Sequence, residues 1–333
     1  MALDDFEDVW INFLSGAFNL EQLQSLYLLG HYTRAPIMNP LAKICFEKLD
    51  LSTTNLQLSQ PKDTNDKQIK QKILKTFFDN LQPERNGVLY FIDPIFRQDY
   101  DLSSEISPFK GIKNGTPCIC FHQLISNEDL TILANIDLHE IKSYTDKLIR
   151  RLQRGKKIRL QTKLGTDLTF TPRDWKWTPL SPKINGKVGF FPIGQVFTAP
   201  IEEETEGTVV VDRLISEFMV DWEDKIPFPS LKQPVSLVIE KGTIVEIKGG
   251  TAANFLEEKC LTRVTPSSRI LGEVTFGTNP NAIRGRNIAI EDCARDTFHV
   301  GFGENRHLGG KNKANVHWDA VVEFDQKKIK ILE

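Results

Sequence analysis

The chain has 333 residues, a length that predicts two domains. Its hydrophobic fraction of 40% and charged fraction of 26% are ordinary for a globular protein with a core, and a formal net charge of -2 gives no reason to expect a nucleic acid or a membrane surface as partner. No apolar run approaches the about 20 residues of a membrane span, and the amino terminus is acidic where a signal peptide would be basic, so we expect a cytoplasmic protein.

The amino-terminal part of the chain predicts helices and a polar connection. Residues 4–14 are amphipathic, and Asn19 could cap a second helix over residues 20–29. Residues 52–66 are rich in Ser, Thr, Asn, Gln and Asp, which is typical of an exposed connection. Residues 67–81 then recover a helical period and place their lysines toward water.

Two short apolar runs and a further helix complete this first part. Residues 88–93 and 117–121 predict buried strands, and residues 141–154 predict an amphipathic helix that Gly155 ends. The order helix, strand, strand, helix favours a small α/β unit. The unit contains neither GxGxxG nor the Walker pattern, so we expect no nucleotide pocket there.

After Gly155 the sequence takes on the punctuation of a β-rich domain, with short apolar runs separated by Gly, Pro and Asn. Residues 252–259 are the one helix-like insertion. The predicted fold class is therefore an α/β amino-terminal domain over residues 1–145 and a β-rich, barrel-like carboxy-terminal domain over residues 146–333. The predicted strands lie within residues 156–170, 187–197, 207–212 and 235–247, the last a hairpin turning at Lys241-Gly242, and in three final segments.

The three final segments each have one apolar face and one face with chemically active side chains. Side chains alternate along a strand, so His317 and Asp319 project from the same side while Trp318 lies opposite. His299 lies among glycines on its strand, opposite an apolar face, and Glu273 lies on the polar face of the first strand. These strands could collect two imidazoles and two carboxylates in one interior.

Two imidazoles and two carboxylates form a metal-ligand set. They suit zinc, manganese, cobalt or iron(II), and no cysteine lies close enough in sequence to indicate a thiolate site. The alternative is that His299 and His317 are satisfied core histidines, with Glu273 and Asp319 on solvated strand faces. Their shared pattern on three strands favours the metal site.

Six stretches, taken in order, resemble the M29 aminopeptidases and the shorter leucyl aminopeptidase-like proteins that share their carboxy-terminal domain. The resemblance covers roughly residues 140 to 325. A ring-cleaving dioxygenase that acts on dihydroxypyridine is similar to the same group. The six stretches are residues 164–170, 191–200, 206–212, 272–280, 298–303 and 308–319.

The resemblance implies a dimeric, metal-dependent aminopeptidase with a two-metal site in its carboxy-terminal domain. Carried over by motif, the ligands are Glu273 of Gly-Glu-Val, His299 of His-Val-Gly, and His317 with Asp319 of His-Trp-Asp. These are the residues that strand alternation selects independently. The implied partners are a peptide or small-molecule substrate and a second copy of the chain.

The chain departs from the family pattern at two positions. Gln195 stands where the family has a glutamate in Pro-x-x-Glu-Val-Phe, and a neutral amide is a weaker ligand for a dication than a carboxylate. Arg306 stands where the longer enzymes have a tyrosine seven residues after the first histidine. Glu291 or Asp292 could supply the carboxylate missing at Gln195.

Three functions follow from these residues. In a hydrolase of peptide or amide bonds, a metal would generate hydroxide, Glu273 would bridge metals or act as general base, and Arg306 or His307 would steady the substrate carboxylate or the oxyanion. In a mononuclear iron(II) dioxygenase, two histidines and one carboxylate would hold the iron. In a degenerate protein, the domain would bind peptides without turnover.

Overall fold

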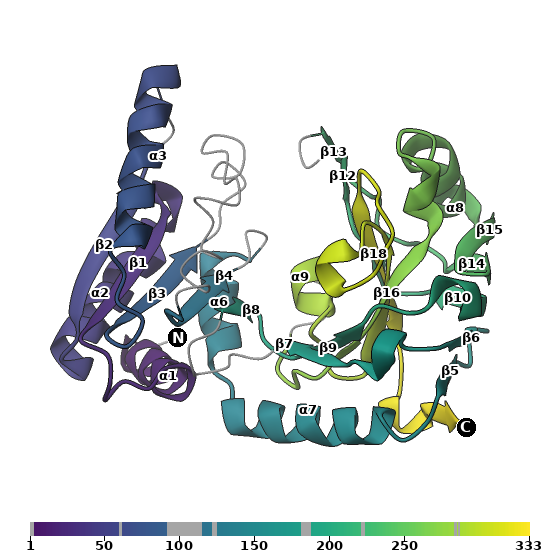
Figure 1. The fold of residues 1–333 in the computed structure, drawn as a ribbon, viewed down its shortest axis with the longest axis horizontal. Coiled ribbons are helices and arrows are strands. Elements are labelled where there is room, and N and C mark those ends of the chain that lie inside the picture. Colours follow the sequence, from purple (N-terminus) through teal and green to yellow (C-terminus); the bar gives the residue numbers. More distant parts are fainter. Residues whose placement is uncertain are drawn as a thin grey trace. The chain divides into compact units, whose positions relative to one another are not determined.

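The computed structural model describes residues 3–59, 62–91, 115–121, 125–180, 188–220, 224–282, 285 and 287–333, and it divides into two compact units (Figure 1). Unit 1 comprises Met1–Glu140 and Ser181–Ile193, and unit 2 comprises Ile141–Leu180 and Gly194–Glu333. The sequence predicted a single boundary between residues 145 and 146. The observed division has two segments in each unit, because β8 (Val188–Phe191) belongs to unit 1, where it pairs with β4.

Unit 1 is an α/β fold built on a parallel sheet of five strands, in the order β2-β1-β3-β4-β8. The predicted strands at 88–93 and 117–121 correspond to β3 and β4, although residues 92 and 93 lie outside the described part of the chain. The elements are α1 (Leu3–Ala17), β1 (Ser25–His31), α2 (Ala35–Leu49), β2 (Ser52–Leu58), α3 (Thr64–Asp79), β3 (Asn86–Phe91), β4 (Cys118–Phe121) and α6 (Asn127–Ala134).

Two predictions for unit 1 are wrong. The helix expected over residues 20–29 is replaced by β1, because Leu26 and Leu28 are fully buried in a strand with partners on both sides. The connection expected over residues 52–66 begins with β2. This is an edge strand, and the side chains of Asn55 and Gln57 donate hydrogen bonds to Asn39 instead of packing in a core.

Unit 2 is β-rich and contains two sheets of six strands, in the orders β15-β14-β10-β6-β5-β19 and β11-β18-β17-β16-β9-β7. Buried residues of both sheets form one hydrophobic core, as when two sheets pack face to face. Among the described residues, neither sheet closes on itself, so the β-rich prediction holds while the barrel is replaced by two open sheets. Open sheets suffice because each buries one apolar face against the other.

The longer strands of unit 2 follow the predicted segments, whereas the short strands β7, β11, β12, β13 and β19 lie outside them. The hairpin turns at Lys241 and Gly242, which both have positive φ, and the helix-like insertion is α8 followed by one π-helical turn, Leu256–Cys260. The bounds are α7 (Leu138–Leu152), β5 (Lys157–Gln161), β6 (Asp167–Phe170), β7 (Thr178–Leu180), β9 (Gln195–Thr198), β10 (Glu206–Val211), β11 (Leu214–Ile215), β12 (Phe218–Val220), β13 (Asp224–Ile226), β14 (Val235–Glu240), β15 (Thr243–Lys248), α8 (Gly250–Phe255), β16 (Leu271–Gly277), α9 (Ile288–Glu291), β17 (Thr297–Gly303), β18 (His317–Glu323) and β19 (Lys330–Leu332).

The indole of Trp318 anchors β18 in the core. It stacks on Phe302 with ring centroids 4.5 Å apart and on Phe218 with centroids 5.1 Å apart. Its Nε1 donates a hydrogen bond to the carbonyl of Ser268, so the buried polar atom is satisfied. With Trp318 held inside, alternation places its neighbours His317 and Asp319 on the opposite face of the sheet.

None of the helices in the described ranges combines the length and the apolar character that crossing a bilayer requires.

Replacement of Gly207 by alanine is expected to destabilise unit 2. Gly207 has a φ of +126°, and an added Cβ would collide with the carbonyl oxygen of Asp167 on the paired strand β6. Gly165 is the matched control, because its φ of +109° carries the same backbone strain but the nearest atom, on Val210, is 3.6 Å away. We expect Gly207→Ala to lower the free energy of unfolding by about 1–3 kcal/mol more than Gly165→Ala in urea titrations. Equal losses would contradict the collision.

Candidate metal centre

The predicted ligands lie on three neighbouring antiparallel strands, on the face turned away from the core. Across β16, β17 and β18, Glu273 lies opposite Gly301, and Gly301 lies opposite Asp319. His299 is two residues before Gly301 on β17, and His317 is two residues before Asp319 on β18. The row across the sheet therefore carries two carboxylates with a glycine between them and imidazoles on both sides.

The ligand atoms of Glu273, His317 and Asp319 lie within 4.8 Å of one another. The Nε2 atom of His317 is 3.1 Å from Oε2 of Glu273 and 3.1 Å from Oδ1 of Asp319. The Nε2 atom of His299 lies 3.4 Å from the other oxygen of Glu273, Oε1. The structure thus brings all four predicted side chains together, and Glu273 lies between the two imidazoles.

Neighbouring groups orient these side chains. The hydroxyl of Thr275 donates a hydrogen bond of 2.5 Å to Oε1 of Glu273. The Nδ1 atom of His317 is 2.7 Å from the carbonyl oxygen of Glu304, and since a carbonyl only accepts, Nδ1 carries the proton. In the neutral imidazole, Nε2 of His317 then presents its lone pair to Glu273 and Asp319.

Gly301 leaves the space at the centre of the cluster. A Cβ on this residue would lie 2.9 Å from Cβ of Glu273 and 2.9 Å from both Cε1 and Nε2 of His317. These separations are too short for ordinary contacts, so any side chain here would displace the carboxylate or the imidazole. Gly301 therefore contributes to the cluster because it has no side chain.

Burial and mutual attraction shift the pKa values of the cluster. Burial alone would raise the pKa of Glu273, but hydrogen bonds to His299 and His317 hold it well below its usual range. Burial alone would lower the pKa of His299, but Asp292 and Glu273 together raise it to about 9. Burial likewise opposes protonation of His317, while Asp319 and Glu273 raise its pKa well above the ordinary value. Without a cation, protons on the imidazoles balance the carboxylates.

The two carboxylates at the carboxyl end of α9, Glu291 and Asp292, have different surroundings. Glu291 is bound by Arg213, with Nη2 and Oε1 2.9 Å apart, so it is engaged away from the cluster. The Oδ1 atom of Asp292 lies 3.5 Å from Nδ1 of His299. Burial raises the pKa of Asp292 well above its usual range, an effect that His299 opposes. Of the two carboxylates proposed to replace the one missing at Gln195, only Asp292 faces the cluster.

Gln195 lies on the same face of the sheet as the cluster, but its side chain contacts Cys293. It is opposite Gly277 at the start of β9, and its side chain hydrogen-bonds the thiol of Cys293. Burial and the nearby Asp292 raise the pKa of Cys293 well above its usual range, which makes it a structural thiol and not a nucleophile.

Arg306 and His307 lie in a short 3-10 helix, Arg306–Leu308, beyond the end of β17. The exposed guanidinium of Arg306 is held by Glu304, with Nε and Oε1 2.7 Å apart and Nη2 and Oε2 3.0 Å apart. The ring of His307 packs edge-on against His317, with centroids 5.3 Å apart. Burial and the neighbouring His317 lower the pKa of His307. Of these two residues, only His307 contacts the cluster.

The donor set fits a divalent cation. Carboxylate oxygens and imidazole nitrogens are ligands for zinc, manganese and iron(II). Asp292 Oδ1 and His299 Nδ1 are buried without a hydrogen-bond partner, which is costly in a low dielectric, and Oδ1 of Asp319 has only Nε2 of His317 at 3.1 Å. A cation beside Gly301 would satisfy Asp319 and replace the protons that the imidazoles otherwise hold.

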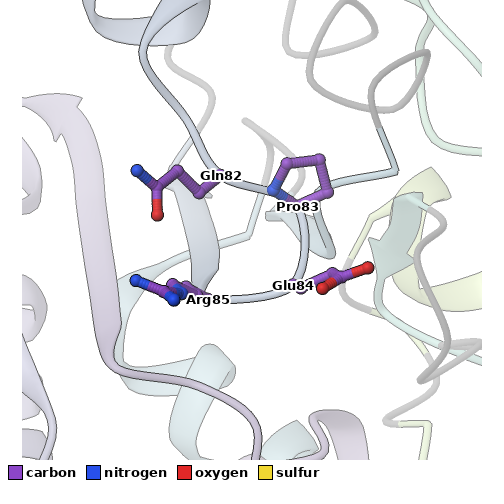
Figure 2. Close-up of a pocket in the computed structure, with 4 residues that line it drawn as sticks. All are labelled: Gln82, Pro83, Glu84 and Arg85. Carbon is purple, nitrogen blue, oxygen red and sulfur yellow. The ribbon is translucent and has the colours of Figure 1, made fainter.

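A surface pocket in unit 1 does not share this chemistry. Gln82, Pro83, Glu84 and Arg85 line it, in the loop that precedes β3 (Figure 2). Ligands of open parallel sheets bind outside the carboxyl ends of the strands, whereas this loop lies at the amino end of β3. The position of this pocket therefore does not indicate a ligand-binding site of the parallel sheet.

The fold and the cluster define a two-unit protein with a candidate divalent-cation site on a β-rich unit. The family model described as 2,5-dihydroxypyridine 5,6-dioxygenase, NicX, matches residues 124–326, more than half of the chain. The chain belongs to this family. The matched region includes every residue of the cluster.

Known proteins from two organisms are similar to the chain. A 2,5-dihydroxypyridine 5,6-dioxygenase of Pseudomonas putida KT2440 is 29% identical over 144 residues, which cover 40% of this chain; the match spans only 39% of that relative. The structure of 2,5-dihydroxypyridine dioxygenase from the same organism superposes with a TM-score of 0.67 and 18% identity, covering 100% of this chain and 96% of the other. AmpT from Thermus thermophilus superposes with a TM-score of 0.63 and 14% identity, covering 99% and 98%. At these identities the two structures establish the fold alone.

Filling the space at Gly301 is expected to weaken metal binding. In Gly301→Ala the new Cβ must displace Glu273 or His317. We expect at least about a tenfold loss of zinc affinity in chelator competition, since misplacing ligands has effects of this order. Circular dichroism of the metal-free variant checks that it folds. An unchanged affinity in a folded variant would contradict a cation beside Gly301.

Metal affinity is expected to rise with pH. Below about 9 the imidazole of His299 is protonated in the metal-free protein, and a proton must leave before Nε2 can bind a cation. Zinc affinity should therefore increase from about pH 6.5 to about 9, with proton release at neutral pH. Calorimetry in buffers of different ionisation enthalpy measures this release. Affinity that does not change over this range would show that protonated histidines take no part.

Proposed function

We propose that this protein is a metal-dependent dioxygenase that opens the ring of a hydroxylated pyridine or a similar small aromatic compound. The observation that carries the proposal is the cluster of Glu273, His317 and Asp319 within the region matched by the dioxygenase family model. The named activity of the Pseudomonas putida relative supports the same reaction class. The family model and this relative favour the dioxygenase over peptide hydrolysis.

Glu273, His317 and Asp319 would hold the metal, and Nε2 of His299, which lies beside the second oxygen of Glu273, would be a fourth donor. When bound, iron(II) supplies the redox chemistry that lets dioxygen react with an aromatic ring. Thr275 keeps Glu273 oriented through its hydrogen bond. The lowered pKa of His307 favours its neutral imidazole, and its position against His317 suits it to accept a proton from a ring hydroxyl.

A metallohydrolase is the second candidate, favoured by one observation. The two oxygens of Glu273 face different imidazoles, Oε1 toward His299 and Oε2 toward His317, as in a carboxylate that bridges two cations. Against it stands Gln195, whose neutral amide is committed to Cys293. In such an enzyme Arg306 would steady a substrate carboxylate only after leaving Glu304.

Metal content and oxygen uptake together test the proposal. Protein purified without oxygen and loaded with iron(II) should bind one iron per chain and consume dioxygen when 2,5-dihydroxypyridine is added, with loss of the ring absorbance. We expect Asp319→Asn to lower kcat/KM by at least about 100-fold, because a metal ligand is lost. Glu323→Gln is the matched control, an exposed carboxylate on the same strand.

Two other outcomes would reject this function. Two zinc, manganese or cobalt ions with release of amino acids from peptides would establish the hydrolase. Peptide binding without any bound metal would establish a binding protein.

A further inference from the structure

The second nitrogen of His299 faces a carboxylate outside the three-residue metal group. Nδ1 of His299 and Oδ1 of Asp292 are both buried, neither has a hydrogen-bond partner, and they lie 3.5 Å apart. On the opposite edge of the same ring, Nε2 faces Glu273. The imidazole therefore lies between Asp292 and the candidate metal centre.

His317 has a close hydrogen bond on its second ring nitrogen, whereas no such bond is formed by the second nitrogen of His299. Nδ1 of His317 donates to the carbonyl of Glu304, which leaves Nε2 free to bind a cation. A histidine that binds a metal through one nitrogen normally donates the other N–H to a carboxylate, carbonyl or water. Around His299 the group in that position is Asp292.

The chain around Asp292 holds this carboxylate in place. The amide N–H of Asp292 donates to the carbonyl of Ile288, which closes the turn after α9. The preceding residue, Glu291, is anchored by Arg213 and by the amide of Gly285. Asp292 is thus presented to the histidine by a segment whose other carboxylate is already bound.

We propose that Asp292 is a positioning residue that keeps the proton of His299 on Nδ1, so that Nε2 is directed toward Glu273 and a divalent cation. The proposal rests on the metal-dependent function proposed above. Asp292 is not assigned as a ligand of the same ion, because the two nitrogens of one imidazole point in divergent directions. A cation between Nε2 and Glu273 lies across the ring from Asp292.

The tautomer of His299 tests the proposal without any enzyme assay. In zinc-loaded protein labelled with nitrogen-15 at histidine, long-range proton–nitrogen spectra distinguish the protonated nitrogen from the coordinated one. His299→Gln assigns the signals. We expect Nδ1 of His299 to carry the proton and Nε2 to bind zinc. Coordination through Nδ1 would overturn the proposal and make Asp292 a ligand.

Zinc affinity supplies the second measurement. Asp292→Asn should weaken zinc binding by about 10–100-fold, the usual effect of losing a carboxylate behind a metal-bound histidine. Asp296→Asn is the matched control, because it makes the same change at an exposed residue of the same loop, and it should leave the affinity unchanged. Wild-type affinity in a folded Asp292→Asn variant would overturn the proposal.

These results separate the two proposals. If the tautomer and the affinity loss appear but 2,5-dihydroxypyridine causes no oxygen uptake, the role of Asp292 stands and the dioxygenase function fails. If oxygen uptake is present but Asp292→Asn binds zinc normally, the positioning role fails alone. Absence of both iron and zinc binding to the wild-type protein would overturn both.

Discussion

The contact of Glu273 with His299 and His317 is the interaction on which the rest of the site depends. One carboxylate, buried on the face of a sheet, is balanced by two imidazoles at 3.4 and 3.1 Å. Buried charge is tolerated only when it is paired and hydrogen-bonded. In the metal-free protein, protons on the histidines provide this balance, and a divalent cation would provide it with fewer protons. The cluster is therefore a place where metal binding and proton release are coupled.

The core of unit 2 positions this cluster through strand alternation. Trp318 is fixed between Phe302 and Phe218, and the residues on either side of it must then face outward. Gly301 lets the side chains of Glu273 and His317 come close to the strand between them, because it has no side chain of its own. Packing on one face of the sheet thus determines the geometry of the chemistry on the other.

A similar fold occurs in a dioxygenase and in AmpT, so architecture alone does not select the reaction. The reaction depends instead on the donors that the fold brings together. Gln195 on β9 is a neutral amide, at the position where the resemblance to the aminopeptidases implies a glutamate. Asp292 brings a carboxylate back, but on the far side of the imidazole of His299. These two positions favour a centre that depends on the orientation of His299 over one with an added bridging ligand.

The sequence by itself determined the longer strands of unit 2, because turn residues and alternating apolar positions mark them locally, and it selected Glu273, His299, His317 and Asp319 from that alternation. It did not indicate the short strands β7, β11, β12, β13 and β19. It also indicated α1, α3, α7 and α8, but not α2, α6, β1 or β2. A leucine-rich run such as residues 26–29 suits a helix or a strand, and only the partners on both sides of β1 decide. Only the tertiary structure showed that Gly301 lies between two carboxylates, that Asp292 and not Glu291 faces His299, and that Arg306 is held by Glu304. Local periodicity specifies which face of a strand a side chain occupies, whereas the pairing of distant segments specifies what that side chain meets.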